Sequence, residues 1–170
     1  MITGYDPETL RELVDRAAAE ARLQELGNGR STAALGERAE LLRLLGRNNE
    51  ALIAAEQAFR LAHFSGDREQ LTTARLRRSR VFQHQGELDR ALAEMTAVRA
   101  TARTEEWASL EGSAAFFAGT VLFDLGRFAE ARAAFGAALD IRSGSEAPVD
   151  EIESARFALE VATRQAAANG

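Results

Sequence analysis

Three glycines, Gly46, Gly86 and Gly126, stand 40 residues apart and mark three similar stretches of the chain. Small or apolar residues recur with the same spacing on both sides of these glycines. A repeat of this length is typical of stacked helix pairs, because one pair alone cannot bury its apolar face and needs a neighbour. The positions that agree in this register are Ala34, Ala74 and Ala114; Leu41, Val81 and Val121; Leu42, Phe82 and Leu122; Ala51, Ala91 and Ala131; and Ala58, Val98 and Ala138.

The residues between the glycines favour helix. Alanine, leucine, arginine and glutamate, all strong helix formers, dominate the chain. A glycine ends a helix at little cost, and the small residue five positions later lets the next helix cross closely. No stretch alternates branched apolar and polar residues, so we predict no sheet. Pro7 after Asp6 suits the start of a first helix. The eight expected helices span residues 6–27, 31–45, 48–64, 67–85, 88–103, 105–125, 128–142 and 148–168.

This pattern resembles the tetratricopeptide repeat, in which a helix, a glycine-containing turn and a second helix form each unit. The third unit carries the resemblance best, through Gly119, Leu122, Gly126, Phe128, Glu130, Ala131, Phe135 and Ala138. The resemblance implies an all-α fold, a right-handed superhelix of antiparallel helix pairs in a single domain over residues 1–170. Its parts would be a leading helix at 6–27, repeats at 31–64, 67–103 and 105–142, and a closing helix at 148–168.

Composition excludes several classes of protein. The chain has no cysteine, so it has no disulfide scaffold and no thiolate metal site. It also has no lysine, and therefore no phosphate-binding loop of the Gly-Lys type. The net charge of −5 opposes nucleic-acid binding, and no apolar run is long enough to span a membrane. We expect a cytoplasmic protein that is not an enzyme and needs no cofactor or metal.

The resemblance also implies a concave surface, lined by the first helix of each pair, that binds an extended peptide. Residues 66–103 hold eight arginines against five acidic residues, so the middle of this surface is basic. Arginine suits carboxylates, and the aromatic residues could receive an apolar side chain. The expected lining residues are Glu40, Arg43, Thr73, Arg77, Arg80, Gln83, His84, Phe116, Thr120 and Phe123.

The sequence therefore predicts a noncatalytic interaction module that binds a protein or peptide carrying acidic or carboxylate groups. Two alternatives remain open at this point. The arginines could instead form a solvated face with intramolecular ion pairs, because neighbouring helices carry many glutamates. The chain could also be a self-associating structural module, such as a homodimer, or a fragment of a larger bacterial regulator.

Overall fold

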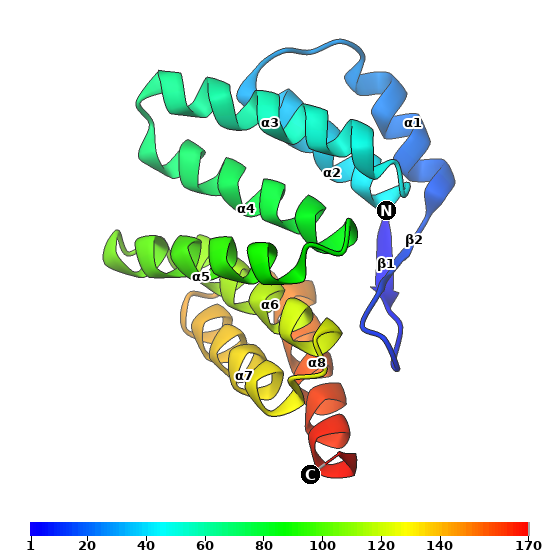
Figure 1. Ribbon diagram of the computed structural model, residues 1–170, viewed down its shortest axis with the longest axis vertical. Coiled ribbons are helices and arrows are strands. Elements are labelled where there is room, and N and C mark those ends of the chain that lie inside the picture. The colour runs from blue at the N-terminus through cyan, green and yellow to red at the C-terminus, as the bar shows by residue number, and fades with distance from the viewer. Residues whose placement is uncertain (170) are drawn as a thin grey trace. The chain divides into compact units, whose positions relative to one another are not determined.

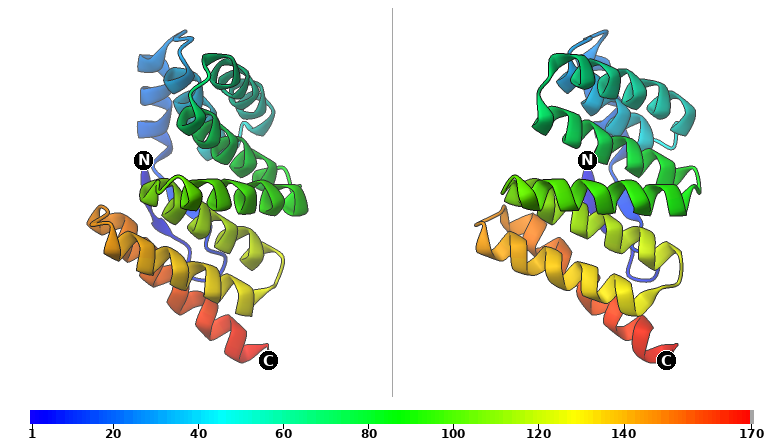
Figure 2. Two further views of the ribbon diagram at one scale, coloured as in Figure 1. Left: turned by 90° about the vertical axis from the view of Figure 1, so that its left-hand side faces the viewer. Right: turned by 60° about the vertical axis from the view of Figure 1, so that its left-hand side comes forward.

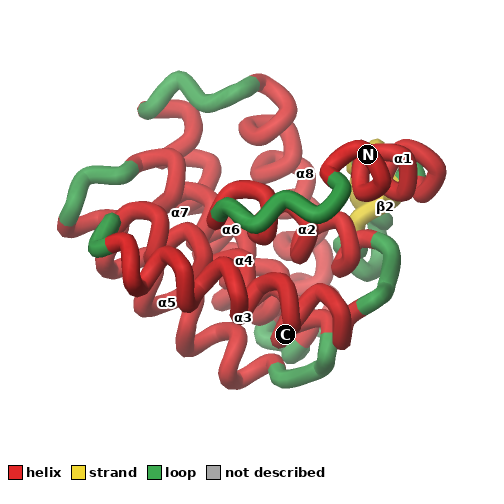
Figure 3. The backbone as a smooth tube through the Cα atoms, turned by 90° about the horizontal axis from the view of Figure 1, so that it is seen from above, coloured by secondary structure: helices red, strands yellow, loops and turns green. Residues whose placement is uncertain are grey.

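The computed structural model describes residues 1–169 and contains eight helices and one two-stranded sheet in that range (Figure 1). Helices cover nearly the whole chain after its N-terminal strands (Figure 3). None of the helices in the described range has the length and apolar character needed to cross a membrane. The elements are β1 (Ile2–Tyr5), β2 (Glu12–Val14), α1 (Arg16–Leu26), α2 (Thr32–Leu44), α3 (Asn48–Ser65), α4 (Arg68–His84), α5 (Leu88–Thr104), α6 (Ala108–Asp124), α7 (Phe128–Gly144) and α8 (Val149–Ala168).

The predicted all-α fold class is confirmed, and helices α2 to α8 begin and end within a few residues of the predicted ranges. The glycines at the repeat turns explain this agreement. Gly46, Gly86 and Gly126 have φ angles of +77°, +83° and +72°, which glycine adopts without strain. At the first of these turns, the N–H of Gly46 donates to the carbonyl of Arg43 and that of Arg47 to Leu42. This bond pattern ends a helix and reverses the chain.

The N-terminus corrects two predictions. The chain does have a small sheet, in which β1 and β2 form an antiparallel hairpin, and residues 6–15 are not part of a helix. The Asp6–Pro7 pair caps only a single turn, in which the Asp6 carboxylate accepts from the N–H groups of Glu8 and Thr9. Leu10 then takes a φ of +54°, which ends the turn and returns the chain as β2.

The first helix begins ten residues later than expected. Asp15 lies just before α1, and its carboxylate accepts from the N–H of Ala18 at 3.0 Å. Asparagine, aspartate and serine are preferred at this capping position because they satisfy an otherwise free backbone donor. Two acidic residues in this region therefore carry a helix-start signal, and only Asp15 is followed by a helix.

The described chain falls into two compact units. Unit 1 contains residues 1–4 and 12–90, and unit 2 contains residues 5–11 and the chain from Ala91 onward. In unit 1, helix α2 packs against α1, α3 and α4. In unit 2, helix α7 packs between α6 and α8 (Figure 2). Whether the chain acts as the single domain predicted from the sequence stays a prediction.

Unit 2 depends on a close approach between α6 and α7. A Cβ atom added at Gly119 of α6 would lie 2.6 Å and 2.7 Å from ring carbons of Phe135 on α7. The Phe135 ring is fully buried, so it has no open space into which it could move. Gly119 therefore sets the distance at which these two helices pack.

We predict that Gly119→Ala destabilises the protein by about 1–3 kcal/mol, because the added methyl group overpacks the helix contact. The measurement is the free energy of unfolding from urea denaturation, followed by far-UV circular dichroism. Gly136→Ala is the matched control, because a Cβ atom there meets nothing within 4 Å on helix α7. That control should stabilise the helix by about 0.5–1 kcal/mol. Equal effects of the two substitutions would contradict the packing argument.

Candidate functional site

The predicted lining residues fall into two groups, one in each unit. Unit 1 holds the basic group, with Glu40 and Arg43 on α2 and the others on α4. Unit 2 holds the aromatic group on α6. The basic group is Glu40, Arg43, Thr73, Arg77, Arg80, Gln83 and His84, and the aromatic group is Phe116, Thr120 and Phe123.

Arg43 is the centre of a buried ionic cluster in unit 1. Its side chain is 0% exposed, although it carries a full charge. Two of its nitrogens donate to the Glu40 carboxylate, with Nη2 at 2.7 Å and Nε at 3.2 Å. The third, Nη1, donates to Oε2 of Glu12 at 2.5 Å. A bidentate guanidinium–carboxylate pair is among the strongest charge-assisted hydrogen bonds, which makes this burial tolerable.

Arg80 completes the cluster from helix α4. It donates to the other oxygen of Glu12 and also to Oε1 of Glu40. Arg80 and Glu40 stand 40 residues apart, so they occupy the same position in successive repeats. Two carboxylates and two guanidinium groups thus balance in charge, and the intramolecular pairing that the sequence left open is present at Arg43 and Arg80.

His84 closes one side of the cluster in its neutral form. Its Nε2 lies 3.0 Å from Nη1 of Arg43, and its Nδ1 lies 3.0 Å from the carbonyl oxygen of Arg80. Because guanidinium only donates, Nε2 accepts and Nδ1 carries the proton that it donates to the carbonyl. Burial, reinforced by the charge of Arg43, lowers the pKa of His84 from 6.5 to about 4.

The two carboxylates stay ionised despite their burial. Desolvation alone would raise the pKa of Glu12, but the charges of Arg80 and Arg43 outweigh it and hold that pKa below its ordinary value. The same balance, with Arg43 first among the opposing charges, holds the pKa of Glu40 far below its ordinary value. Each carboxylate is therefore a fixed negative charge at neutral pH.

Arg77 lies one turn before Arg80 on α4 and does not pair with the carboxylates of the cluster. A Cβ atom added at Gly36 would clash with its guanidinium, so the absence of a side chain there lets Arg77 lie across helix α2. Within the described residues 1–169, Arg77 makes no hydrogen bond and no ion pair within 4.0 Å. Its charge nevertheless helps to lower the pKa values of Glu37 and Glu40. A shallow pocket of about 360 Å³ lies beside it, lined by Thr32, Ala33, Asp67, Glu69, Gln70, Thr73 and Arg77. Gln83, further along α4, is buried.

The two aromatic residues of the group in unit 2 are buried as well. Phe116 packs against Tyr5, Phe117 and Phe135, with ring centroids 5.5–5.8 Å apart. Phe123 packs edge-on against a ring of α7 at 5.0 Å. The Thr120 hydroxyl donates to a backbone carbonyl of its own helix. Phe116 and Phe123 fill the core of unit 2 and present no aromatic surface to a ligand, whereas Thr120 is half-buried.

Sequence reasoning missed two charged residues that shape these groups. Glu12, expected within a helix, supplies one of the two carboxylates that neutralise the arginines. Arg142 is buried in unit 2, where its guanidinium lies 4.6 Å from the centre of the Phe116 ring and donates to the carbonyl of Glu151. Burial lowers the pKa of Arg142. The repeat register gives no signal for either residue. For Glu12 the reason is that both of its partners are more than 30 residues away.

We predict that Glu12→Gln destabilises the protein by about 3 kcal/mol, because it leaves Arg43 and Arg80 buried with half of their negative charge removed. Urea denaturation at pH 7 measures this loss. Glu50→Gln is the matched control, because Glu50 pairs with Arg47 on an exposed face of α3. An exposed pair contributes little, so the control should change stability by less than about 0.5 kcal/mol. If both variants lose equally little, the cluster is not a structural requirement.

The low pKa of His84 predicts a pH dependence of stability. Between pH 6.5 and pH 4 the unfolded chain binds a proton at this residue that the folded chain does not. The free energy of unfolding therefore falls as the pH falls through this window, and the contribution is fully present above pH 6.5. We expect a loss of about 1–2 kcal/mol between pH 7 and pH 5.

His84→Gln should flatten this dependence when urea unfolding is measured at half-unit steps between pH 7 and pH 5. His63→Gln, at an exposed position of α3, is the matched control and should keep the wild-type dependence. Restricting the range to pH 5 and above separates the histidine from the carboxylates, which titrate at lower pH. Identical slopes in the wild type and His84→Gln would show that His84 is accessible to protons in the folded state.

Comparison with known proteins shows which family has this fold. No curated protein matches the sequence. Among solved structures, the crystal structure of BtubC (BKLC) from P. vanneervenii is similar in fold, with a TM-score of 0.69 and 15% identity. The match covers 89% of this chain and 65% of that one, so the chain spans less than two thirds of BtubC. The family model of the tetratricopeptide repeat-like domain matches residues 9–162. Because that match covers most of the sequence, the chain belongs to the tetratricopeptide repeat-like domain family.

Proposed function

We propose that the chain is a noncatalytic protein-interaction module that holds an acidic segment of a partner against helices α2 and α4. This surface, called the α2–α4 face below, consists of the half-buried Glu40, Thr73 and Arg77, together with the buried Arg43 and Arg80 that pair with Glu40. Membership of the family supports the general role, because tetratricopeptide repeat-like domains generally mediate protein interactions. The acidic character of the partner follows from the chemistry of this face.

The observation that carries the proposal is the position of Glu12. This residue belongs to the extended strand β2, and its carboxylate bridges Arg43 of α2 and Arg80 of α4. A strand from another protein has the same backbone and can offer the same carboxylate. This contact supports an acidic extended segment as the ligand of the α2–α4 face, because the chain itself places one such carboxylate against α2 and α4.

Arg77 is the arginine that a partner carboxylate would contact. Arg43 and Arg80 are already neutralised within the chain, whereas Arg77 makes no ion pair within residues 1–169. It lies beside the pocket that Thr73 helps to line. A partner carboxylate can therefore pair with Arg77 without separating Glu12 from its arginines. Reversing the charge of Arg77 should then weaken the binding of the partner.

Selection from a phage-displayed library of random 12-residue peptides tests the proposal, with the affinity of synthetic copies measured by fluorescence anisotropy. We expect acidic peptides whose affinity falls at least tenfold in Arg77→Glu, because reversal of the charge repels the carboxylate. Arg75→Glu is the matched control. Arg75 is exposed two residues away and has no ion pair in the described part of the chain. That variant should bind within twofold of the wild type.

The proposal fails if none of the selected peptides binds Arg77→Glu more weakly than the wild type. It also fails if they carry no excess of aspartate and glutamate. Raising the salt concentration gives a second check, because an interaction through the partly solvent-accessible Arg77 weakens as the ionic strength rises.

A further inference from the structure

Helix α3 exposes three large apolar side chains on one stripe. Ile53, Leu61 and Phe64 are 61%, 42% and 83% exposed. Residues spaced by three, four, seven and eleven positions share a helix face, so Gln57 and Arg60 lie on the same stripe. A cluster of apolar side chains on a solvent-exposed surface indicates a binding site, whereas single exposed apolar side chains do not.

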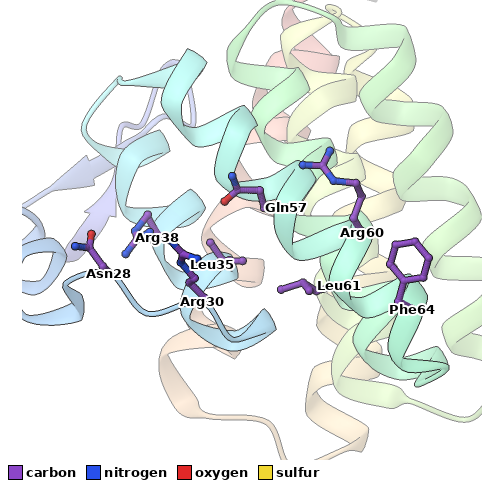
Figure 4. A pocket seen from close by; sticks show the side chains of 8 residues that line it. All are labelled: Asn28, Arg30, Leu35, Arg38, Gln57, Arg60, Leu61 and Phe64. Carbon is purple, nitrogen blue, oxygen red and sulfur yellow. The ribbon is translucent and has the colours of Figure 1, made fainter.

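The stripe borders a groove of about 840 Å³ in unit 1. Helix α3 forms one wall, and helix α2 with the loop that precedes it forms the other (Figure 4). Figure 4 shows Leu61 directed toward Leu35 and Arg30. The groove shares no residue with the α2–α4 face. Its lining residues are Asn28, Arg30, Leu35, Arg38, Gln57, Arg60, Leu61 and Phe64.

Three of the lining residues are arginines, and none is acidic. Arg38 donates to the backbone carbonyl of Gly27. Arg30 and Arg60 are exposed and make no hydrogen bond or ion pair within residues 1–169. Elsewhere on the surface an arginine such as Arg47 pairs with a glutamate three residues away. The groove therefore has positive charge that the described chain does not neutralise.

We propose that this groove is a second docking site, which receives an acidic amphipathic helix of a partner protein. The apolar stripe from Ile53 to Phe64 runs for about 16 Å along α3, which matches three turns of a helix laid beside it. Leu61 and Phe64 meet the apolar face of that helix. Arg30 and Arg60 pair with carboxylates along its edge.

The test is a selection with phage-displayed random 18-residue peptides, followed by anisotropy measurements and by circular dichroism of the bound peptide. Peptides of this site should be acidic, carry apolar residues at helical spacing and gain helicity on binding. Their affinity should fall at least tenfold in Phe64→Ser and in the double variant Arg30→Glu, Arg60→Glu. The substituted residues are exposed, so the fold should persist, and circular dichroism of each variant verifies this.

Matched controls separate this site from other causes. Val149→Ser removes a side chain that is 74% exposed on α8, and Arg75→Glu reverses an exposed arginine away from the groove. Both should bind within twofold of the wild type. Arg77→Glu should also leave these peptides unaffected, so the outcome for the α2–α4 face is read separately from the same set of variants.

Three results would overturn the proposal. The first is a selection in which no peptide depends on Phe64 or on the groove arginines. The second is a set of groove-dependent peptides that are basic or remain unstructured when bound. The third is concentration-dependent dimerisation in light scattering that Phe64→Ser abolishes, because a second copy of the chain would then cover the groove.

Discussion

Close approach between helices, made at residues with a small side chain or none, is the constraint on which both units depend. Gly119 admits the ring of Phe135 in unit 2, and Gly36 admits the Arg77 side chain in unit 1. Alanines such as Ala51 and Ala131 are fully buried at equivalent positions of two repeats. Packing at this density leaves little room for adjustment, so the 40-residue period records where helices touch.

The ionic cluster is the opposite kind of interaction, because it places charge where small apolar contacts would ordinarily be found. Arg43 is tolerated in the interior only because Glu40 and Glu12 together accept from three of its nitrogens. Glu40 comes from the same helix, whereas Glu12 comes from a strand 31 residues earlier. Unit 1 therefore includes β2 as an integral part and depends on it for charge balance.

The helices from α2 onward could be predicted from the sequence, because turn glycines and small packing residues are local signals with a regular spacing. The hairpin could not be predicted, because Asp6 and Pro7 favour a capped turn whether or not a helix follows it. What ends that turn is the left-handed conformation of Leu10, whose side chain is buried in the core of unit 2. The conformation of Leu10 is thus set by tertiary packing, which the periodicity of the sequence does not reveal.

The candidate site could be predicted only in part, because some of its residues lie in the repeats and others do not. The resemblance to the tetratricopeptide repeat assigned Glu40, Arg43, Arg80 and His84 to one face, and the structure places them together. Their mutual neutralisation depends on Glu12, which lies 68 residues from Arg80 and outside any repeat. The groove beside α3 was missed because its arginines and apolar residues are spread over a loop and two helices, and they meet only in three dimensions.

The pairing of Glu40 with Arg80 bears on how such a chain can be redesigned. These residues occupy one position of the repeat, so a consensus sequence would place the same residue in both helices. Two glutamates or two arginines would then face each other in a partly buried site, and like charges there repel. The divergence between neighbouring repeats is thus itself a structural element, and arrays of identical repeats built from this chain would need an uncharged residue at that position.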